Sequence, residues 1–462
     1  MPVGDDTHTK DPALDKPITI RFLLMFSLPT MVSMLGMGVF GIIDGIFAAR
    51  YIDAYALSAV GLVTPFIMFA MSLGIMLGTG GNALVAKLVG EGEFKYARRD
   101  MTLVSIASFL LSIALSTLGF LFPDLILQIL GVDADVYHMA YTYMLAIMPF
   151  LPLAGLGMLF QQFMMTEGKA HISMIASLGS GLLGVYLNYL LIYQLHMGLQ
   201  GAAIATGITY AVPAGTGFLF LLFNRKGTLY FVMPKLRWFV IFQAASNGIS
   251  EMVGILAFSI TGVLMNNILM DLDGAMAVAA VGISGGVGGL IGNLYFGFAA
   301  GISPLISYNF GKGDTHNLKK LFSQALTICI SLALSASILV FFFAEFFLGI
   351  YDIDPLFYAG GFIFNLPVYD LSITAIHLMT FGFVFMAINN FGSIMFTSLN
   401  DGVTSAIIAF CGSFLFIMIF VPLFAYLWGV NGVFIATPAA NVATFAVTGF
   451  LFLKNRKKYH YA

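Results

Sequence analysis

Long apolar runs separated by short polar segments dominate this chain. A helix needs about 20 apolar residues to cross the hydrocarbon layer of a bilayer. The twelve runs of that kind lie near residues 22–49, 55–86, 101–123, 137–165, 172–195, 199–223, 238–270, 274–309, 321–349, 371–398, 403–427 and 430–453. The pattern therefore predicts an all-α polytopic membrane protein with twelve transmembrane helices.

The composition agrees with a membrane protein. Hydrophobic residues make up 60% of the 462 residues and charged residues only 9%, with a mean hydropathy of +0.96. A soluble domain carries about 25% charged residues, so we expect the lipid bilayer to cover most of this surface. The net charge of −2 argues against a nucleic-acid partner. Cys329 and Cys411 lie inside apolar runs, so neither a disulfide nor a metal site is expected there.

The positive charges are distributed asymmetrically between the two sides of the predicted membrane. Of the twenty Lys and Arg residues, only Arg50 falls in an odd-numbered loop, and the other nineteen lie in the two tails and the even-numbered loops. The positive-inside rule then predicts that both termini are cytoplasmic. The first seventeen residues are polar and mixed in charge, unlike a cleaved signal, so we expect the first span to direct insertion.

The chain contains an internal duplication. Residues 73–99 and 296–320 align when Gly90 is matched with Gly311, and residues 197–212 align with 428–443. Both pairs have the same predicted membrane orientation, which indicates two parallel six-helix lobes related by an axis along the membrane normal. The predicted parts are an N-terminal tail (1–20), an N-lobe (21–225), a cytoplasmic linker (226–237), a C-lobe (238–453) and a C-terminal tail (454–462).

Two carboxylates stand alone inside apolar runs. Asp44 is the only charged residue between Phe22 and Ala49, and Glu251 lies about thirteen residues into its own run. A charge in the bilayer costs about 3 kcal/mol or more, so it is kept where it has a polar partner, a water-filled cavity, or a proton or cation to bind. Asp44 is therefore the first functional candidate. Glu251 is the second, with hydrogen bonding to polar neighbours as its structural alternative.

Amide side chains inside the apolar runs are further candidates. Five of them are proposed to line a substrate cavity or to contribute to function: Gln161, Asn266, Asn267, Asn389 and Asn390. Hydrogen bonds between helices explain each one at least equally well. Pro29 makes the first span breakable, which favours it as a hinge.

Several motifs, taken in order along the chain, resemble those of a known family. They are LLMFSLPTMVSMLGMGVFGIIDGIFAARY (23–51), the Gly-Glu-Gly-Glu loop (90–93), MGLQGAAIAT (197–206) and SYNFGKGDTHNLKK (307–320). Together with the duplicated six-plus-six plan, they resemble the multidrug and toxic compound extrusion (MATE) transporters over nearly the whole chain.

The resemblance implies a function. A protein of this family is a secondary active antiporter that exports organic cationic or amphipathic compounds in exchange for Na⁺ or H⁺. Its two lobes enclose a central V-shaped cavity that opens alternately to each side. The resemblance implies no cofactor besides the coupling ion, a monomer, and a prokaryotic plasma (inner) membrane.

The resemblance also implies an ion-coupling site. Asp44 matches the aspartate of the family's first helix, and the matching positions of the fifth helix are Gly184 and Asn188. One polar ligand of the family pattern is thus missing and the other is an amide. Helical rise places Asp44 and Asn188 at similar depths. Na⁺ held by Asp44 and Asn188, and a proton held by Asp44 alone, are both compatible with these residues.

Two other function classes were weighed. A flippase for lipid-linked precursors has a related architecture, but no Lys or Arg lies within the core of any span, which disfavours an anionic lipid substrate. A membrane-embedded transferase would need acidic or histidine residues clustered near one membrane face, and the acidic residues here are scattered. Ion-coupled export is the favoured function.

Overall fold

The computed structural model describes residues 14–51, 54–350 and 366–462, and within these ranges its regular structure is entirely helical. In chain order the helices are α1 (Ile20–Tyr51), α2 (Ala54–Gly90), α3 (Phe94–Leu121), α4 (Pro123–Ile129), α5 (Ala134–Ile147), α6 (Leu151–Thr166), α7 (Ala170–Asn188), α8 (Gly198–Phe223), α9 (Trp238–Asp273), α10 (Ala275–Lys312), α11 (Thr315–Phe342), α12 (Ala344–Ile350), α13 (Leu366–Thr380), α14 (Phe383–Ser398), α15 (Gly402–Phe410) and α16 (Phe416–Tyr459).

The described helices give twelve spans, as the apolar runs predicted. Ten continuous segments are long and apolar enough to cross a membrane, and α13 with α14, bent by 53°, forms an eleventh. One of the ten runs from Gly402 to Tyr459 over 58 residues, about 87 Å by helical rise and far longer than one crossing. Gly429 interrupts it with φ 61° and ψ −140°, which divides it into the last two spans.

The sequence pattern missed the breaks and the short helices. The run at 137–165 forms α5 and α6, separated by a 3₁₀ turn at Met148–Phe150, because Pro149 cannot donate the next helical hydrogen bond. The helices α4 and α12 each follow a long helix, α3 and α11, after a single residue. They begin at equivalent repeat positions, Pro123 and Ala344, because 344 − 123 equals 311 − 90.

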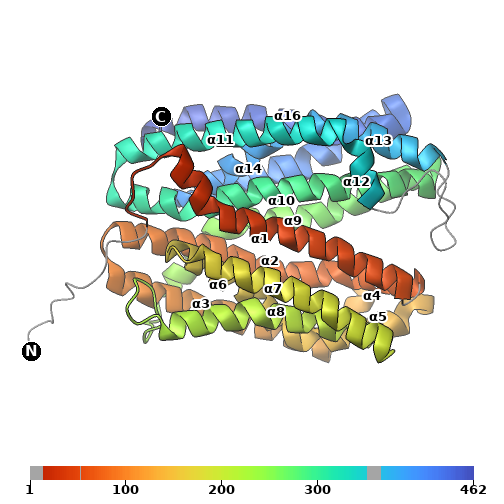
Figure 1. The fold of residues 1–462 in the computed structure, drawn as a ribbon, viewed down its shortest axis with the longest axis horizontal. Helices are drawn as coiled ribbons and strands as arrows, with labels where there is room; N and C mark the ends of the chain where they lie inside the picture. Colours follow the sequence, from red (N-terminus) through yellow and green to blue (C-terminus); the bar gives the residue numbers. More distant parts are fainter. Residues whose placement is uncertain (1–13, 52–53, 351–365) are drawn as a thin grey trace, which may run out of the picture.

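The helices form two bundles that lie one above the other in Figure 1. We call α1–α8 the N-lobe and α9–α16 the C-lobe. We call the end of the molecule where α2, α8, α10 and the chain itself finish the terminal end, and the opposite end the distal end (Figure 1). The helix α1 lies along the junction. It contacts α7 where Phe40 meets Gly181, and it contacts α10 of the C-lobe where Met31 meets Gly297.

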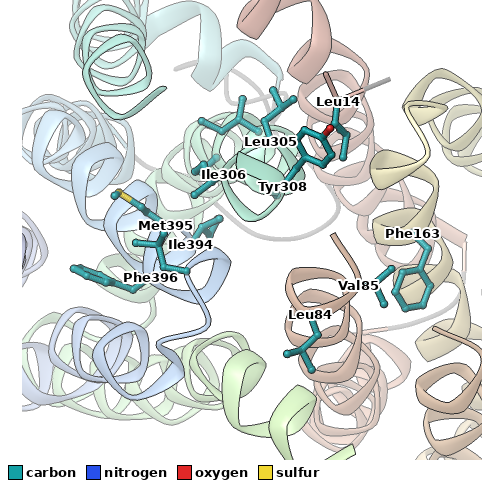
Figure 2. Packing of buried hydrophobic residues seen from close by; sticks show 14 of the residues in the cluster. Leu14, Leu84, Val85, Phe163, Leu305, Ile306, Tyr308, Ile394, Met395 and Phe396 are labelled. Carbon is teal, nitrogen blue, oxygen red and sulfur yellow. The ribbon is translucent and has the colours of Figure 1, made fainter. Parts of the chain in front are cut away.

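One hydrophobic core joins the two lobes near the terminal end. It contains Leu84 and Val85 of α2 together with Leu305 and Ile306 of α10, and Figure 2 shows these side chains along with Phe163 of α6 and Met395 of α14. Toward the distal end the described buried residues form separate clusters, one within the N-lobe and three within the C-lobe. The lobes are therefore packed together at the terminal end and have separate cores at the distal end.

The segment between α8 and α9 is bound to the N-lobe. The Glu167 carboxylate, in the turn between α6 and α7, accepts hydrogen bonds from the backbone N–H of Thr228 (2.9 Å) and Leu229 (2.8 Å) and from Nδ2 of Asn224 (3.0 Å). Nε of Arg98 donates to the Thr228 carbonyl at 2.8 Å. The linker assigned to 226–237 thus has an ordered path along the N-lobe, and the domain boundaries stay a prediction.

Candidate functional site

A cavity of about 870 Å³ opens beside the junction of the lobes. Its described lining comes from α9, α10, α13, α14, α15 and α16 of the C-lobe, the π-helical segment Cys411–Leu415 that joins α15 to α16, and Gly38 and Gly41 of α1. Most of the wall is apolar or glycine. Several glycines of α10 border this space: a Cβ on Gly282, Gly285 or Gly289 would meet no atom within 4 Å. The small side chains of α10 therefore widen the cavity.

Four of the predicted polar residues line this cavity: Glu251, Asn266, Asn389 and Asn390. Glu251 is partly buried and is the acidic residue among the described lining residues. Within the described part of the chain, no hydrogen bond or ion pair holds its carboxylate. The structural alternative for Glu251, a carboxylate engaged by polar neighbours, is therefore not what the described side chains show.

The two neighbouring amides on α14 differ from each other. Asn389 is buried, its Nδ2 donates to the carbonyl of Asn441 at 2.9 Å, and its Oδ1 accepts from the Thr448 hydroxyl at 2.9 Å. Asn390 is partly buried and has no hydrogen-bond partner among the described residues. Asn389 therefore ties α14 to α16, whereas Asn390 is available to a molecule in the cavity.

A chain of buried hydroxyls lies behind Glu251. The Ser250 hydroxyl is 3.3 Å from that of Thr397, the Thr397 hydroxyl donates to Ser405 at 2.8 Å, and the Ser405 hydroxyl donates to the Ser393 carbonyl at 2.6 Å. The hydroxyl hydrogens of Thr397 and Ser405 are already used in these bonds, so in the contact between Ser250 and Thr397 the Ser250 hydroxyl is the donor. The oxygen lone pairs of Ser250 are then left to face the cavity. This polarity favours a cation beside Glu251 over an anion.

Asn293 and Ser250 also line the cavity, and neither was predicted from the sequence. Asn293 follows Gly292 on α10, and its Nδ2 would lie 2.9 Å from a Cβ on Gly38. A lone amide inside a glycine-rich apolar helix was the available signal. Ser250 carried none, because a serine in a membrane helix is usually satisfied by its own backbone.

The predicted N-lobe pair is only partly visible. Asp44 belongs to α1, but its side chain lies outside the described residues. Asn188, at the end of α7, is buried, and Gly184 is buried with the Thr209 methyl 2.8 Å from where a Cβ would be. From the Phe40–Gly181 contact, Asp44 lies about 6 Å and Asn188 about 10 Å farther along parallel helices. Their similar depth leaves a shared site geometrically possible.

The remaining candidates lie apart from the cavity. Gln161 is buried in α6 and is not part of the described lining, and Asn267 is exposed on α9 one position beyond Asn266. Pro29 lies inside α1, which continues through it from Ile20 to Tyr51. The Ser33 hydroxyl donates to the Pro29 carbonyl at 2.9 Å, a bond that uses one of the acceptors near the proline.

The described lining of the cavity offers oxygen atoms that a cation can contact. No group of three or more His, Cys, Asp or Glu side chains that could hold a metal ion occurs among the described residues. A monovalent cation in this cavity would instead meet one carboxylate with amide and hydroxyl oxygens around it. The Phe258, Phe383 and Met386 side chains in the wall can contact apolar and aromatic parts of a larger ligand.

Comparison with known proteins gives consistent results. The family model MatE matches residues 29–190 and 252–423. The protein named Multidrug export protein MepA from Staphylococcus saprophyticus is 24% identical over 80% of this chain and 81% of its own length. Its namesake from Staphylococcus aureus is 25% identical over 80% of this chain and 81% of its own.

Solved structures are similar over almost the whole chain. One is described as the outward-facing conformation of a multidrug resistance MATE family transporter of the MOP superfamily. It has a TM-score of 0.89 and 19% identity and covers 98% of this chain and 99% of its own. Another, MATE in the straight conformation, has a TM-score of 0.88 and 20% identity, with coverage of 98% and 99%. At this identity the likeness concerns the fold.

Proposed function

The chain belongs to the MatE family of membrane transporters, and from this premise we propose that it exports organic cationic or amphipathic compounds by ion-coupled antiport. The observation that carries the proposal is the cavity of about 870 Å³ with a mostly apolar wall, where the Glu251 carboxylate has no partner among the residues that the structure describes. A carboxylate in such surroundings binds a cation strongly because little water competes with the ligand. As a member of a family of transport proteins, the chain is not an enzyme.

The relatives support the class of substrate. The MepA proteins of two staphylococci are named for multidrug export, which favours drug-like compounds over the lipid-linked precursors of a flippase. The cavity agrees with this preference, because no Lys or Arg is among its described lining residues. A lipid-linked pyrophosphate would need positive charge to offset its own.

Coupling to an ion is the finer part of the proposal. A proton or Na⁺ that binds Glu251 or Asp44 would neutralise the carboxylate and so compete with a cationic substrate for it. Because the ion and the substrate favour different arrangements of the lobes, inward movement of one can drive outward movement of the other. Asp44 with Asn188 is the proposed N-lobe site, and Na⁺ and H⁺ are both candidates for the ion.

We infer outward transport from the distribution of the charges. The nineteen Lys and Arg residues of the tails and even-numbered loops support a cytoplasmic terminal end in a prokaryotic plasma membrane. The lobes share a core at that end, and we infer that this arrangement is closed on the cytoplasmic side. Outward release of a substrate is consistent with this state.

The test is dye accumulation in bacterial cells that lack their own exporters. Cells that express the wild-type chain should retain less of a cationic dye than cells that carry an empty vector. The variant Glu251→Gln should lose this difference, whereas Asn267→Ala, on the same helix but outside the described lining, should keep it. Equal retention in wild-type and empty-vector cells would contradict export of cations.

A further inference from the structure

Glycines at equivalent positions of the internal repeat make close contacts between the lobes. Gly90 at the end of α2 faces α10: a Cβ on it would lie 2.1 Å from the Tyr308 carbonyl oxygen. Gly311 at the end of α10 faces α2: a Cβ on it would lie 2.1 Å from the Lys87 carbonyl oxygen. The repeat offset of 221 residues (311 − 90) carries Lys87 onto Tyr308. The two contacts therefore join equivalent residues of the repeat and are related by its pseudo-two-fold symmetry.

The same offset relates a second pair of contacts deeper in the molecule. Gly80 of α2 lies against α9, where a Cβ would be 1.9 Å from the Ala244 carbonyl oxygen and 2.5 Å from the nitrogen of Gly248. Its equivalent, Gly301 of α10, lies against Ser27 of α1, with a Cβ 2.8 Å from that of Ser27. Ser27 is itself the equivalent of Gly248, because 248 − 27 is 221. At both positions the glycine backbone lies so close to the neighbouring helix that a residue with a side chain would not fit.

Glycines of the same helices behave differently toward the distal end. Gly61 of α2, Gly41 of α1 and Gly262 of α9 have no atom within 4 Å of an added Cβ. The terminal-end glycines face backbone atoms, which cannot move aside as a flexible side chain can. At the terminal end, the close approach of the lobes therefore requires glycine. At these distal positions the surrounding space would accept a side chain.

We propose that Gly80, Gly90, Gly248 and Gly301, with Gly311, form a pseudo-two-fold seal that closes the terminal end and must separate for the cavity to open there. This inference rests on the proposed export function, because only an alternating transporter needs to break the contact. The Gly248 contact lies three residues, about one helical turn, before Glu251 on α9. Movement of α9 at the seal therefore displaces the carboxylate that the ion and the substrate would share.

The first test measures the separation of the lobes without requiring transport. Spin labels at Lys95 and Lys319, both exposed at the terminal end of different lobes, report the distance by double electron–electron resonance on the purified full chain. Gly90→Ala and Gly311→Ala should each add a longer-distance population, and by the repeat symmetry the two shifts should be similar. Gly61→Ala on α2 should leave the distribution unchanged. Unchanged distances in both seal variants would overturn the proposal.

The second test keeps every glycine, so the glycine contacts of the seal are unchanged before the cross-link forms. Because a Cβ on Gly90 would lie 3.0 Å from the nitrogen of Lys312, cysteines at Glu91 and Lys312 should cross-link when Cys329 and Cys411 are replaced by serine. The cross-linked protein should export no dye and should recover on reduction. Full export by the cross-linked protein would refute the seal. If the wild type exports no dye at all, the proposed function fails, and the spin-label result still decides whether these glycines set the closure.

Discussion

Glu251 and Asn389 show how two polar side chains on one cavity wall can have opposite roles. Asn389 has both amide atoms engaged, by the Asn441 carbonyl and the Thr448 hydroxyl, and so contributes to the folded state. Glu251 and Asn390 have no hydrogen-bond partner among the described residues and so are available to a ligand. A buried polar group that is left without a partner costs about 1–3 kcal/mol, which makes the two roles separable by measurement.

The neighbouring amides of α14 provide a matched pair for that measurement. Asn389→Ala should lower the free energy of unfolding by about 1 kcal/mol, because it removes the hydrogen bonds that tie α14 to the Asn441 carbonyl and the Thr448 hydroxyl of α16. Asn390→Ala should leave the melting temperature in detergent nearly unchanged and should weaken dye binding. Equal melting temperatures for the two variants would contradict this assignment.

At the scale of helices, glycine serves a second purpose where the chain turns sharply. Gly198 and Gly429 both have positive φ, 54° and 61°, and they match each other in the second stretch of the internal repeat. A residue with a side chain pays about 1–2 kcal/mol to adopt this conformation. The two lobes therefore use the same device to enter their last helices.

Substitution at these two turns should confirm the equivalence. Gly198→Ala and Gly429→Ala should each lower the free energy of unfolding by about 1–2 kcal/mol. Gly215→Ala and Gly449→Ala, in open space on α8 and α16, should be neutral or stabilise by up to about 1 kcal/mol. The comparison is made by thermal unfolding in detergent. A large loss of stability in Gly215→Ala or Gly449→Ala would contradict the conclusion that the positive φ is what requires glycine at Gly198 and Gly429.

The segment that joins the lobes gives a prediction that depends on pH. Burial raises the pKa of the Glu167 carboxyl above its ordinary value of 4.5, more than the hydrogen bonds from Asn224, Leu229 and Thr228 lower it. The folded state then holds this proton more tightly than the unfolded state. The stability that Glu167 provides is complete below pH 4.5 and falls as the pH rises through the raised folded-state pKa.

Two variants check this argument. Glu167→Ala should destabilise the protein by about 1–3 kcal/mol at all pH values because it orphans the backbone N–H groups of Thr228 and Leu229. It should also remove the decline in stability that Glu167 causes as the pH rises above 4.5. Glu93→Gln, at a helix start where the side chain makes no capping bond, should do neither. If the stability of Glu167→Ala still declines as the pH rises, another titrating group causes the decline.

For the whole molecule, apolar run length and the repeat were sufficient to predict the twelve helices and the two lobes. The break at Pro149 and the 53° bend between α13 and α14 were missed because they depend on local hydrogen bonding and on packing against other helices. The cavity was only partly predicted. Glu251 and Asn390 stand out as lone polar residues, but Asn293 and Ser250 gain their place from the approach of α1 and α14, which no single segment encodes.

The orientation in the membrane is a prediction about the entire chain. Since nineteen of the twenty Lys and Arg residues lie on the terminal side, that side should be cytoplasmic. In cells or right-side-out vesicles, an impermeant maleimide should label a cysteine at Asp133, at the distal end, and not one at Lys319. The background again lacks Cys329 and Cys411. Labelling of the cysteine at Lys319 and not of the one at Asp133 would show that the topology, and with it the direction of export, is the reverse of the predicted one.

The central claim is that ion movement drives the export of cations through the cavity, where the Glu251 carboxylate supplies the negative charge. Its most direct test is dye efflux from proteoliposomes under an imposed Na⁺ gradient or an imposed pH gradient, applied separately to wild type, Glu251→Gln and Asp44→Asn. The account predicts efflux by the wild type that follows one gradient, with loss of coupled efflux in both variants. Full gradient-driven efflux by Glu251→Gln, or no wild-type efflux under either gradient, would contradict it.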